Sequence, residues 1–223
     1  MSVAGAAKLQ ALARHIAAPG LFCAVAPIDM ATPALLPDEL ACVARAIPRR
    51  RHEFAVGRMV LRHALHLAGH KLPAAQPIVA RSDRQPDLPP GLRASLSHSR
   101  DYCIAVAASD PALCPGVDIE RMAADRPDDL AQVIAPWRQR PPVADAELLA
   151  FSAKESLFKS QYPETGMMLD FTDAALALSG HRMRARLACG RFLSGAWGQA
   201  AGHFLVISWR TRQTDGPEFL PKD

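Results

Sequence analysis

The feature that most constrains the fold of this chain is a short segment, Gly116–Glu120, with the sequence Gly-Val-Asp-Ile-Glu. Its apolar and acidic residues alternate, which predicts a β-strand because successive side chains of a strand point to opposite faces. Val117 and Ile119 would then face a core, while Asp118 and Glu120 share the other face. The sequence therefore predicts a strand that buries one face and presents two carboxylates on the other.

A second segment, Phe151–Lys159, reads Phe-Ser-Ala-Lys-Glu-Ser-Leu-Phe-Lys and lies in a helix predicted over residues 145–161. Two structural interpretations account for its charges. Ser152 and Glu155 fit a capping box at a helix start, and Lys159 can pair with Glu155 at i, i+4. The functional interpretation is that this acid and two lysines join the acidic strand in a site for a divalent cation and a phosphate-bearing substrate. The residues alone leave both interpretations open.

The strongest helix predicted in the first half covers Arg49–Leu65, because its apolar residues recur at helical spacing. Three arginines at spacings of seven and four line a neighbouring face of this helix: Arg51, Arg58 and Arg62. They are either a solvated edge of the helix or a row of guanidinium groups that binds a phosphate.

The composition indicates a globular chain with a core of its own, since 49% of the 223 residues are hydrophobic. The net charge of +4 is too small to indicate nucleic-acid binding by itself. The five cysteines are odd in number and have no Cys-x-x-Cys spacing, so we expect reduced, mostly buried thiols and no disulfide framework or zinc site. No window approaches the roughly eighteen apolar residues of a membrane span, and no leader sequence is evident. We therefore expect a cytoplasmic protein without a membrane partner.

The remaining elements are predicted from apolar periodicity and turn residues. Helices are expected over residues 5–18 and 37–46, and strands over 21–28, 102–108, 168–178, 183–189 and 192–209. Residues 121–142 are polar and rich in proline, which predicts a long connection with one helical segment. A loose polar end is expected after Thr211.

The segment 95–99, Ser-Leu-Ser-His-Ser, raises the question of nucleophilic catalysis. Adjacent strand residues point to opposite faces, and the chain has no Gly-x-Ser-x-Gly elbow, so a hydrolase triad is not predicted. His98 is better interpreted as a phosphate partner. A hairpin between strand 102–108 and the acidic strand would bring Ser97 and His98 close to the carboxylates if the strand register allowed it.

These motifs occur in a defined order: the basic helix, the Arg-x-Pro-x-x-Pro-x-Gly loop at Arg84–Gly91, Leu-Ser-His, Gly-Val-Asp-Ile-Glu and Phe-Ser-Ala-Lys-Glu-Ser. Together they resemble the 4'-phosphopantetheinyl transferases, of the longer class typified by the enzymes that activate surfactin and enterobactin synthetases. The enterobactin branch is the more similar one. The resemblance runs from about Arg49 to Asp173. Gln85 departs from it, because many relatives have a basic residue there. We therefore expect binding of the 3'-phosphate to depend on Arg84.

The resemblance implies transfer of the phosphopantetheine arm of coenzyme A to a serine of an acyl or peptidyl carrier protein, with 3',5'-ADP as the other product. It implies an Mg²⁺ ion held by three acids: Asp118, Glu120 and Glu155. It implies catalytic roles for Asp118, Glu155 and Lys159, with either Glu155 or a metal-ordered water accepting the serine proton. It implies that coenzyme A is bound by the following residues: Arg51, Arg58, Arg84, Ser97, His98, Lys154 and Lys159. This mechanism requires the three acids to converge within ligand distance of one cation.

The fold implied by the resemblance is α+β, a pseudo-two-fold pair of similar α/β halves with the active site in the cleft between them. Residues 1–112 would grip the nucleotide, and residues 113–223 would hold the metal and the pyrophosphate. The implied protein is a monomer that acts in siderophore, non-ribosomal peptide or polyketide synthesis. We expect the carrier to dock on a partly apolar surface built from the 121–142 connection and the nearby helix, where Arg138 and Arg140 would contribute.

Two other functions remain open at this point. One is a catalytically inactive relative that binds coenzyme A or a carrier protein, which the intact set of acids and lysine disfavours. The other is a nucleic-acid-binding protein that uses the Arg49–Arg62 stripe, which the lack of interleaved aromatic residues disfavours.

Overall fold

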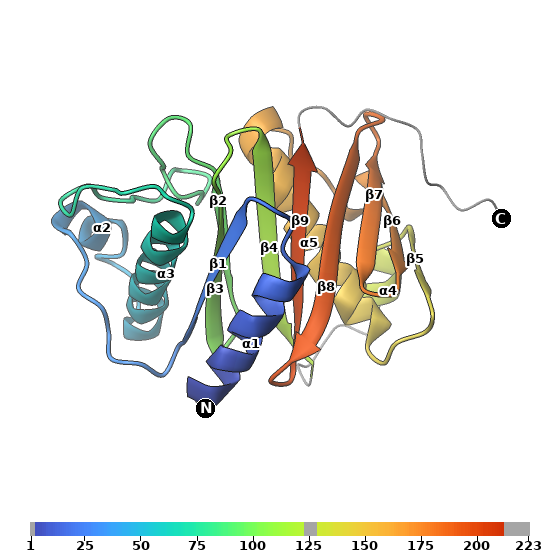
Figure 1. The fold of residues 1–223 in the computed structure, drawn as a ribbon, viewed down its shortest axis with the longest axis horizontal. Helices are drawn as coiled ribbons and strands as arrows, with labels where there is room; N and C mark the ends of the chain where they lie inside the picture. Colours follow the sequence, from blue (N-terminus) through green and yellow to red (C-terminus); the bar gives the residue numbers. More distant parts are fainter. Residues whose placement is uncertain (1–2, 123–128, 212–223) are drawn as a thin grey trace.

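The computed structural model of this protein describes residues 3–122 and 129–211. Within them, two β-sheets lie next to each other and carry helices on their faces (Figure 1). This mixed content confirms the predicted α+β class. The pseudo-two-fold relation between the halves 1–112 and 113–223 stays a prediction.

The first sheet has three antiparallel strands in the order β1-β3-β2. Its strands are β1 (Leu21–Pro27), β2 (Ala94–His98) and β3 (Tyr102–Ala108). The long helix α3 (Pro48–Leu67) buries its apolar stripe against small side chains of β1 and β3 on one face of this sheet. The short helix α2 (Pro37–Cys42) precedes α3 in the chain. Because β3 is the central strand and is covered on both faces, every one of its residues is buried.

The second sheet has six strands in the order β4-β9-β8-β7-β6-β5. Its strands are β4 (Leu113–Arg121), β5 (Trp137–Arg140), β6 (Ala174–Ser179), β7 (Arg182–Leu187), β8 (Phe192–Ala200) and β9 (His203–Thr211). All neighbours are antiparallel except β5 and β6, which are parallel. The helices of this half are α4 (Leu130–Val133), α5 (Ala146–Thr165) and a 3₁₀ turn (Phe171–Asp173).

Two helices cover opposite faces of the second sheet. α5 packs behind β4 and β9 in Figure 1, on an apolar cluster that includes Leu157 and Val206. α1 (Val3–Ile16) lies in front, and its residue Leu9 shares a cluster with Ile104 of the first sheet and Ile207 of the second. The two sheets therefore share one part of their core.

The structure corrects three predictions about the elements. Strand 102–108 forms no hairpin with the acidic strand, because β3 pairs with β1 and β2 while β4 pairs with β9. The connection 121–142 holds the predicted helical segment, α4, but also the unpredicted strand β5. The strand expected over 192–209 is two strands, because the chain turns at Gly202, whose φ is +72°. The polar end expected after Thr211 lies outside the described residues.

The cysteines of the structure are all free, and three of the five are buried. In the part of the chain that is described, no helix combines the length and the apolar character that a membrane span requires.

Candidate active site

Asp118 is the centre of a buried polar network between the two sheets. The predicted alternation of its strand is confirmed, since Val117 and Ile119 are fully buried in the core shared with α1 and Asp118 points to the other side of β4, toward α5. Its Oδ1 accepts hydrogen bonds from Ser97 Oγ at 2.8 Å and from Lys159 Nζ at 2.6 Å. Lys159 Nζ also donates to Ser97 Oγ at 3.1 Å. Residues from β2, β4 and α5 thus meet at one carboxylate.

Ser152 completes this network from α5. Its Oγ donates to Asp118 Oδ2 at 2.8 Å, and the serine is fully buried. The capping box predicted for Ser152 and Glu155 is therefore wrong: α5 begins at Ala146, so Ser152 lies well inside the helix. The alternative partner proposed for Lys159 also differs from the structure, in which Lys159 forms its ion pair with Asp118.

Gly116 allows α5 to approach β4 closely enough for these contacts. A Cβ on Gly116 would lie 1.9 Å from Ser156 O and 2.7 Å from Ser160 N, which no side chain could accommodate. Small hydroxyl residues fasten the same contact, since Ser160 Oγ donates to Cys114 O at 2.6 Å and Ser208 Oγ donates to Ser156 O at 2.7 Å. The glycine of the acidic strand is therefore required for packing, and this packing delivers Ser152 and Lys159 to Asp118.

Glu120 and Glu155 lie close enough to Asp118 for their ionisation to depend on it. Burial, and then the charges of Asp118 and Glu155, raise the pKa of Glu120 to about 7, against the opposing effect of Lys159. Burial raises the pKa of Glu155 as well, with a further increase from Asp118 and a decrease from Lys159. The region thus concentrates three carboxylates around a single lysine.

A large cavity adjoins this network, with a volume of about 1030 Å³. Its walls come from α3, from residues 80–86, from β2 and from α5, so that both halves of the chain contribute. Basic side chains outnumber acidic ones in its lining: Arg50, Arg58, Arg81, Arg84, His98 and Lys159, against Glu53, Asp83 and Glu155. Ser97 also lines it. A cavity of this size and charge suits a large anionic ligand.

Arg58 is the predicted arginine that both lines this cavity and is deeply buried. Its Nε donates to Ile78 O at 2.5 Å, and its Cζ lies 4.0 Å from the centre of the Phe54 ring. Burial lowers the pKa of Arg58 to about 10, so the side chain keeps its charge at neutral pH. The structure therefore holds this guanidinium in a defined position at the wall of the cavity.

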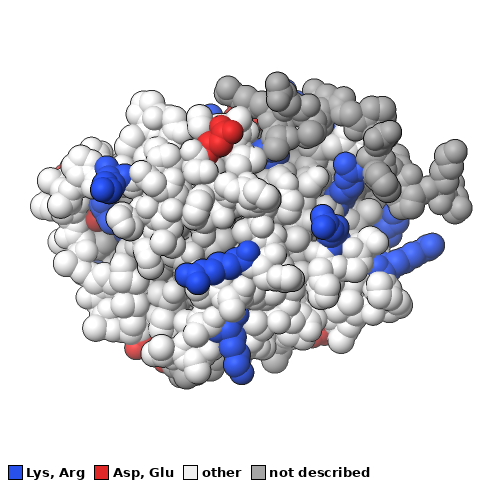
Figure 2. All heavy atoms as spheres, in the orientation of Figure 1, with Lys and Arg blue, Asp and Glu red and all other residues white. Residues whose placement is uncertain are grey.

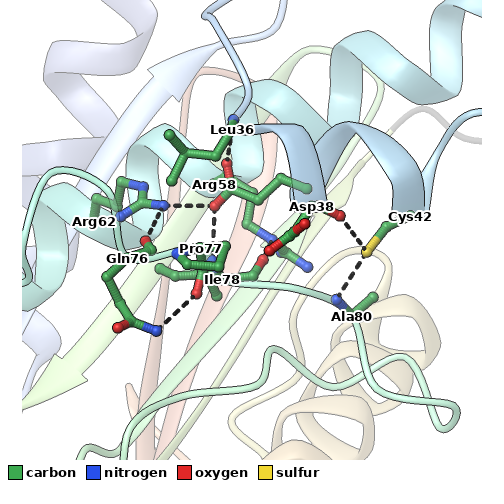
Figure 3. A network of polar contacts seen from close by, with 10 residues as sticks. Leu36, Asp38, Cys42, Arg58, Arg62, Gln76, Pro77, Ile78 and Ala80 are labelled. Atoms are coloured by element: carbon green, nitrogen blue, oxygen red, sulfur yellow. Dashed lines mark hydrogen bonds and ion pairs between the residues drawn. The ribbon is translucent and has the colours of Figure 1, made fainter.

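The other two arginines of the predicted stripe have structural partners. Arg51 Nε donates to the carbonyl oxygens of Val43 at 3.1 Å and Ala46 at 2.9 Å, and Arg51 is not among the residues that line the cavity. Arg62 Nη2 forms an ion pair with Glu39 at 2.6 Å and also reaches Gln76 O at 2.7 Å (Figure 3). Both therefore fasten α3 to neighbouring backbone.

Sequence reasoning missed Arg50 and Arg81, which do line the cavity. Arg50 Nη1 lies 3.2 Å from His98 Nε2. The unpredicted Arg50 and the predicted His98 therefore meet at the same wall of the cavity. The run of three arginines at 49–51 indicated a basic surface here, but Arg51 was chosen because its spacing from Arg58 placed the two on one helix face. Arg84 lines the cavity as expected of its loop and has a positive φ of 71°.

Lys154 lies apart from the large cavity. Its Nζ donates to Phe171 O at 2.5 Å, and it lines a smaller, mainly apolar cavity of about 220 Å³ with Met168 and Phe171. Burial lowers the pKa of Lys154 to about 8. The two cavities share only Glu155 and Phe158 among their lining residues, and Lys154 lines only the smaller one.

The carboxylates are of the right chemical type to bind a divalent cation, but their positions do not form a metal site. They offer oxygen ligands only, which Mg²⁺ prefers. Burial, more than the neighbouring acids, raises the pKa values of Glu120 and Glu155, and a bound cation would favour their ionised forms. However, within residues 3–122 and 129–211 no three acidic, histidine or cysteine side chains are grouped closely enough to hold a metal ion. The convergence of Asp118, Glu120 and Glu155 that was expected is thus not formed here, where Lys159 supplies the positive charge at Asp118.

Comparison with known proteins identifies the family of this chain. A family described as the 4'-phosphopantetheinyl transferase N-terminal domain matches residues 38–108. The 4'-phosphopantetheinyl transferase Svp of Streptomyces mobaraensis is 38% identical over 192 residues, which are 78% of this chain and 77% of Svp. This chain belongs to the 4'-phosphopantetheinyl transferase family. The 4'-phosphopantetheinyl transferase PptT of Mycobacterium tuberculosis is 31% identical over 147 residues, 62% of this chain and 63% of PptT.

The protein is therefore an enzyme, a phosphopantetheinyl transferase, and the family match can be compared with the lining of its cavity. The match over residues 38–108 covers α3, the loop at 80–86 and β2, which form most of the basic wall. Ser97, Asp118, Ser152 and Lys159 lie where this wall meets α5. The transferase thus has its cationic groups and its carboxylates at one boundary between the two sheets.

Proposed function

We propose that the enzyme transfers the 4'-phosphopantetheine group of coenzyme A to a serine of an apo acyl or peptidyl carrier protein, in an Mg²⁺-dependent reaction that releases 3',5'-ADP. The observation that carries this proposal is the cavity of about 1030 Å³, whose lining includes five Lys and Arg side chains together with Glu155, and whose Lys159 also contacts Asp118. Coenzyme A has charged phosphates at both ends of its nucleotide part. A cavity that carries several cations beside an acid and a lysine matches such a ligand.

In this proposal the cations of the cavity hold the nucleotide. Arg58 and Arg84 contact phosphate oxygens, and His98, beside Arg50, takes the 3'-phosphate. Lys159 holds the pyrophosphate, because its Nζ already lies at the boundary between the cavity and Asp118. Asp118, Glu120 and Glu155, which are not grouped as a metal site among the described residues, would have to converge to hold Mg²⁺. When bound, the ion would neutralise the pyrophosphate and stabilise the departing 3',5'-ADP.

Glu155 is suited to accept the proton of the attacking serine. Burial raises the pKa of Glu155, and a raised pKa makes a carboxylate a stronger base at neutral pH. The serine oxygen forms a bond to the β-phosphorus, the bond from this phosphorus to the 3',5'-ADP oxygen breaks, and the serine proton moves to Glu155 or to an ordered water. A metal ion at Glu155 would lower its basicity, so the two acceptors are alternatives.

The finer parts of the proposal follow the resemblance described from the sequence. They are the surfactin and enterobactin type, a pseudo-two-fold pair of halves, a monomeric cytoplasmic enzyme, and carriers of siderophore, peptide or polyketide synthesis. In coenzyme A binding, Arg51 and Lys154 are the members of the expected set that the cavity supports least, since neither lines it.

Mass spectrometry of a carrier domain tests the proposal. The enzyme is incubated with coenzyme A, Mg²⁺ and an apo carrier domain, and the carrier is expected to gain the mass of one phosphopantetheine. EDTA and Asp118→Ala should each abolish the gain. Binding of coenzyme A without a mass gain would instead support an inactive relative. A second readout, calorimetric titration of the enzyme alone with Mg²⁺, should show binding that Asp118→Ala removes.

A further inference from the structure

A further cavity, of about 310 Å³, lies beside the large cavity of the candidate active site. Its walls come from residues of the proline-rich segment 85–94, from the first residues of β4 and from the last turns of α5. We call this space the proline cavity. The residues that line both cavities, and so form the wall between them, are Arg81, Gln85, Pro86, Ala94 and Pro163.

The lining of the proline cavity is stiff, largely apolar and cationic. Its large aliphatic residues are Leu88 and Leu92, and five prolines line the space with them. Because a proline ring fixes the backbone φ angle, walls rich in proline keep their shape. Two arginines, Arg81 and Arg93, also line the cavity, and none of the described residues in its lining is Asp or Glu. Sites for small molecules combine apolar walls with a few polar groups in this way.

Arg93 brings to this cavity a guanidinium nitrogen without an acceptor. Its Nε is buried and has no hydrogen-bond partner among the described residues, whereas Arg81 Nε pairs with Asp87 at 3.0 Å. The backbone of Arg93 is fixed at the start of β2, because its carbonyl oxygen accepts a hydrogen bond from Ala108 N at 2.9 Å. Buried polar groups are nearly always hydrogen-bonded, so this exception requires an explanation.

The other ionisable groups near Arg93 do not supply the missing negative charge. Cys114 lines the cavity, but burial raises the pKa of its thiol to about 12, so the thiol is uncharged at neutral pH. Glu164 raises that pKa further, yet Glu164 forms an ion pair with Arg210 at 2.5 Å and does not line the cavity. The acceptor for Arg93 therefore comes from outside the described chain, as a water molecule or as a ligand.

We propose that the proline cavity is a second binding site, which takes a small monocarboxylate with an apolar body and binds its carboxylate through Arg93. A carboxylate can accept hydrogen bonds from Nε and one Nη of the same guanidinium, and such a charged, two-pronged pair is stronger than a bond to water. Leu88, Leu92 and the prolines would contact the apolar body. A volume of about 310 Å³ admits a molecule of the size of benzoate and lies at the lower end of the range for ligand sites.

This site is separate from the proposed transfer reaction. None of the residues to which a role in binding coenzyme A or Mg²⁺ is assigned lines the proline cavity, and Arg93 does not line the large cavity. Binding of a carboxylate can therefore be measured without coenzyme A or a carrier protein.

An NMR titration of the isotope-labelled enzyme with benzoate tests the proposal. We expect a Kd of about 1 mM or lower. The amide signals of Gly91, Leu92 and Cys114 should shift most, because these residues line the cavity. Benzamide has the shape of benzoate without its charge, and inorganic phosphate has charge without an apolar body. Each should bind at least about tenfold more weakly than benzoate.

Substitution of Arg93 gives a second readout. Arg93→Met should raise the Kd of benzoate at least about tenfold and leave the KM for coenzyme A unchanged. Arg93→Lys keeps the charge without the planar fork and should give a smaller rise. Lys and Arg side chains are spread over the face shown in Figure 2, so attraction of an anion does not by itself locate a site. The matched control is therefore Arg50→Met in the large cavity, which should change the Kd less than about twofold.

Four outcomes would overturn the proposal: no binding of benzoate, equal binding of benzamide or phosphate, equal effects of Arg93→Met and Arg50→Met, or signal shifts confined to the lining of the large cavity. If Arg93→Met does not fold, the ligand series and the map of shifts on the unchanged enzyme still decide. Benzoate binding at the expected residues without any modification of a carrier would count against the transfer reaction and leave this site standing.

Discussion

Asp118 shows at the scale of single residues how partners that are distant in sequence define a side chain. Its strand position follows from local alternation, but its three donors come from β2 and α5. Ser152 carries the strongest local signal for a helix cap, and yet its hydroxyl serves Asp118. A short sequence motif can therefore identify residues of the site without identifying the residues that they contact.

Ser152→Ala tests the bond to Asp118. The change leaves one oxygen of a buried carboxylate without its donor, so we expect the free energy of unfolding to fall by about 1–3 kcal/mol. Urea denaturation measures this loss. Ser156→Ala is the matched control on the same helix, because Ser156 is equally buried and donates only to Ala153 O. Equal losses in the two variants would contradict the role assigned to Ser152.

Glu39 predicts a specific pH dependence of stability. Burial raises its pKa, but hydrogen bonds from Ile78 N and Leu36 N and the charge of Arg62 outweigh burial and hold the pKa of Glu39 below its ordinary value. Its ionised form therefore contributes stability above about pH 4, and this contribution is lost as the pH falls through the lowered pKa. Glu39→Gln lacks that titration. The difference in unfolding free energy between the enzyme and this variant should shrink between about pH 7 and about pH 3, and a constant difference would refute the assignment.

Arg50 and Arg51 offer a comparison of adjacent residues. Arg50→Ala removes a cation from the cavity wall, so we expect the KM for coenzyme A to rise about tenfold with little change in stability. Arg51→Ala removes the donor of backbone carbonyls at Val43, Ala44 and Ala46. It should lower the free energy of unfolding by about 1–3 kcal/mol and leave the KM unchanged. Steady-state kinetics and urea denaturation measure both quantities. A raised KM for Arg51→Ala and a loss of stability for Arg50→Ala would instead indicate that Arg51 binds the nucleotide.

At the scale of elements, the contact of α5 with β4 decides whether the site exists. Gly116→Ala would force a methyl group into the backbone of α5, so we expect a loss of about 1–3 kcal/mol in unfolding free energy and a loss of transfer activity. Gly57→Ala, inside helix α3, is the opposite case, because a Cβ there makes only ordinary van der Waals contacts, with Leu96 Cδ1 at 3.5 Å and Cys103 Sγ at 4.0 Å. It should stabilise the protein by about 0.5–1 kcal/mol. Thermal unfolding compares the two, and a stabilising Gly116→Ala would show that the close approach is not required.

Most element types followed from the sequence, but their pairing did not. The helices predicted over 5–18 and 49–65 correspond to α1 and α3, because their apolar residues repeat at helical spacing. Strand β5 was missed, because it is short and lies among prolines, and only its pairing with β6 makes it a strand. The predicted hairpin of β3 with β4 was wrong because strand pairing depends on distant segments. The sequence of a strand does not by itself specify which strand it pairs with.

At the scale of the whole molecule, α1 joins the two sheets. Leu9 is fully buried in a cluster with Ile104 of β3 and Ile207 of β9. Leu9→Ala should lower the free energy of unfolding by about 2–5 kcal/mol, and hydrogen exchange should show parallel loss of protection in β3 and β9. Val3→Ala is the control on the same helix, because Val3 is 79% exposed. Loss of protection in one sheet only would show that the halves unfold independently.

The sequence by itself determined the acidic strand, the lysine-bearing helix and the family, since each depends on the order and spacing of residues along the chain. Only the tertiary structure decided that Ser152 and Lys159 bind Asp118, that Arg50 and not Arg51 lines the cavity, and that the three acids do not form a metal-binding group here. These outcomes depend on how closely α5 approaches β4 at Gly116 and on which way a helix turns toward its neighbours. Such distances are set by packing between distant segments, which local spacing does not encode.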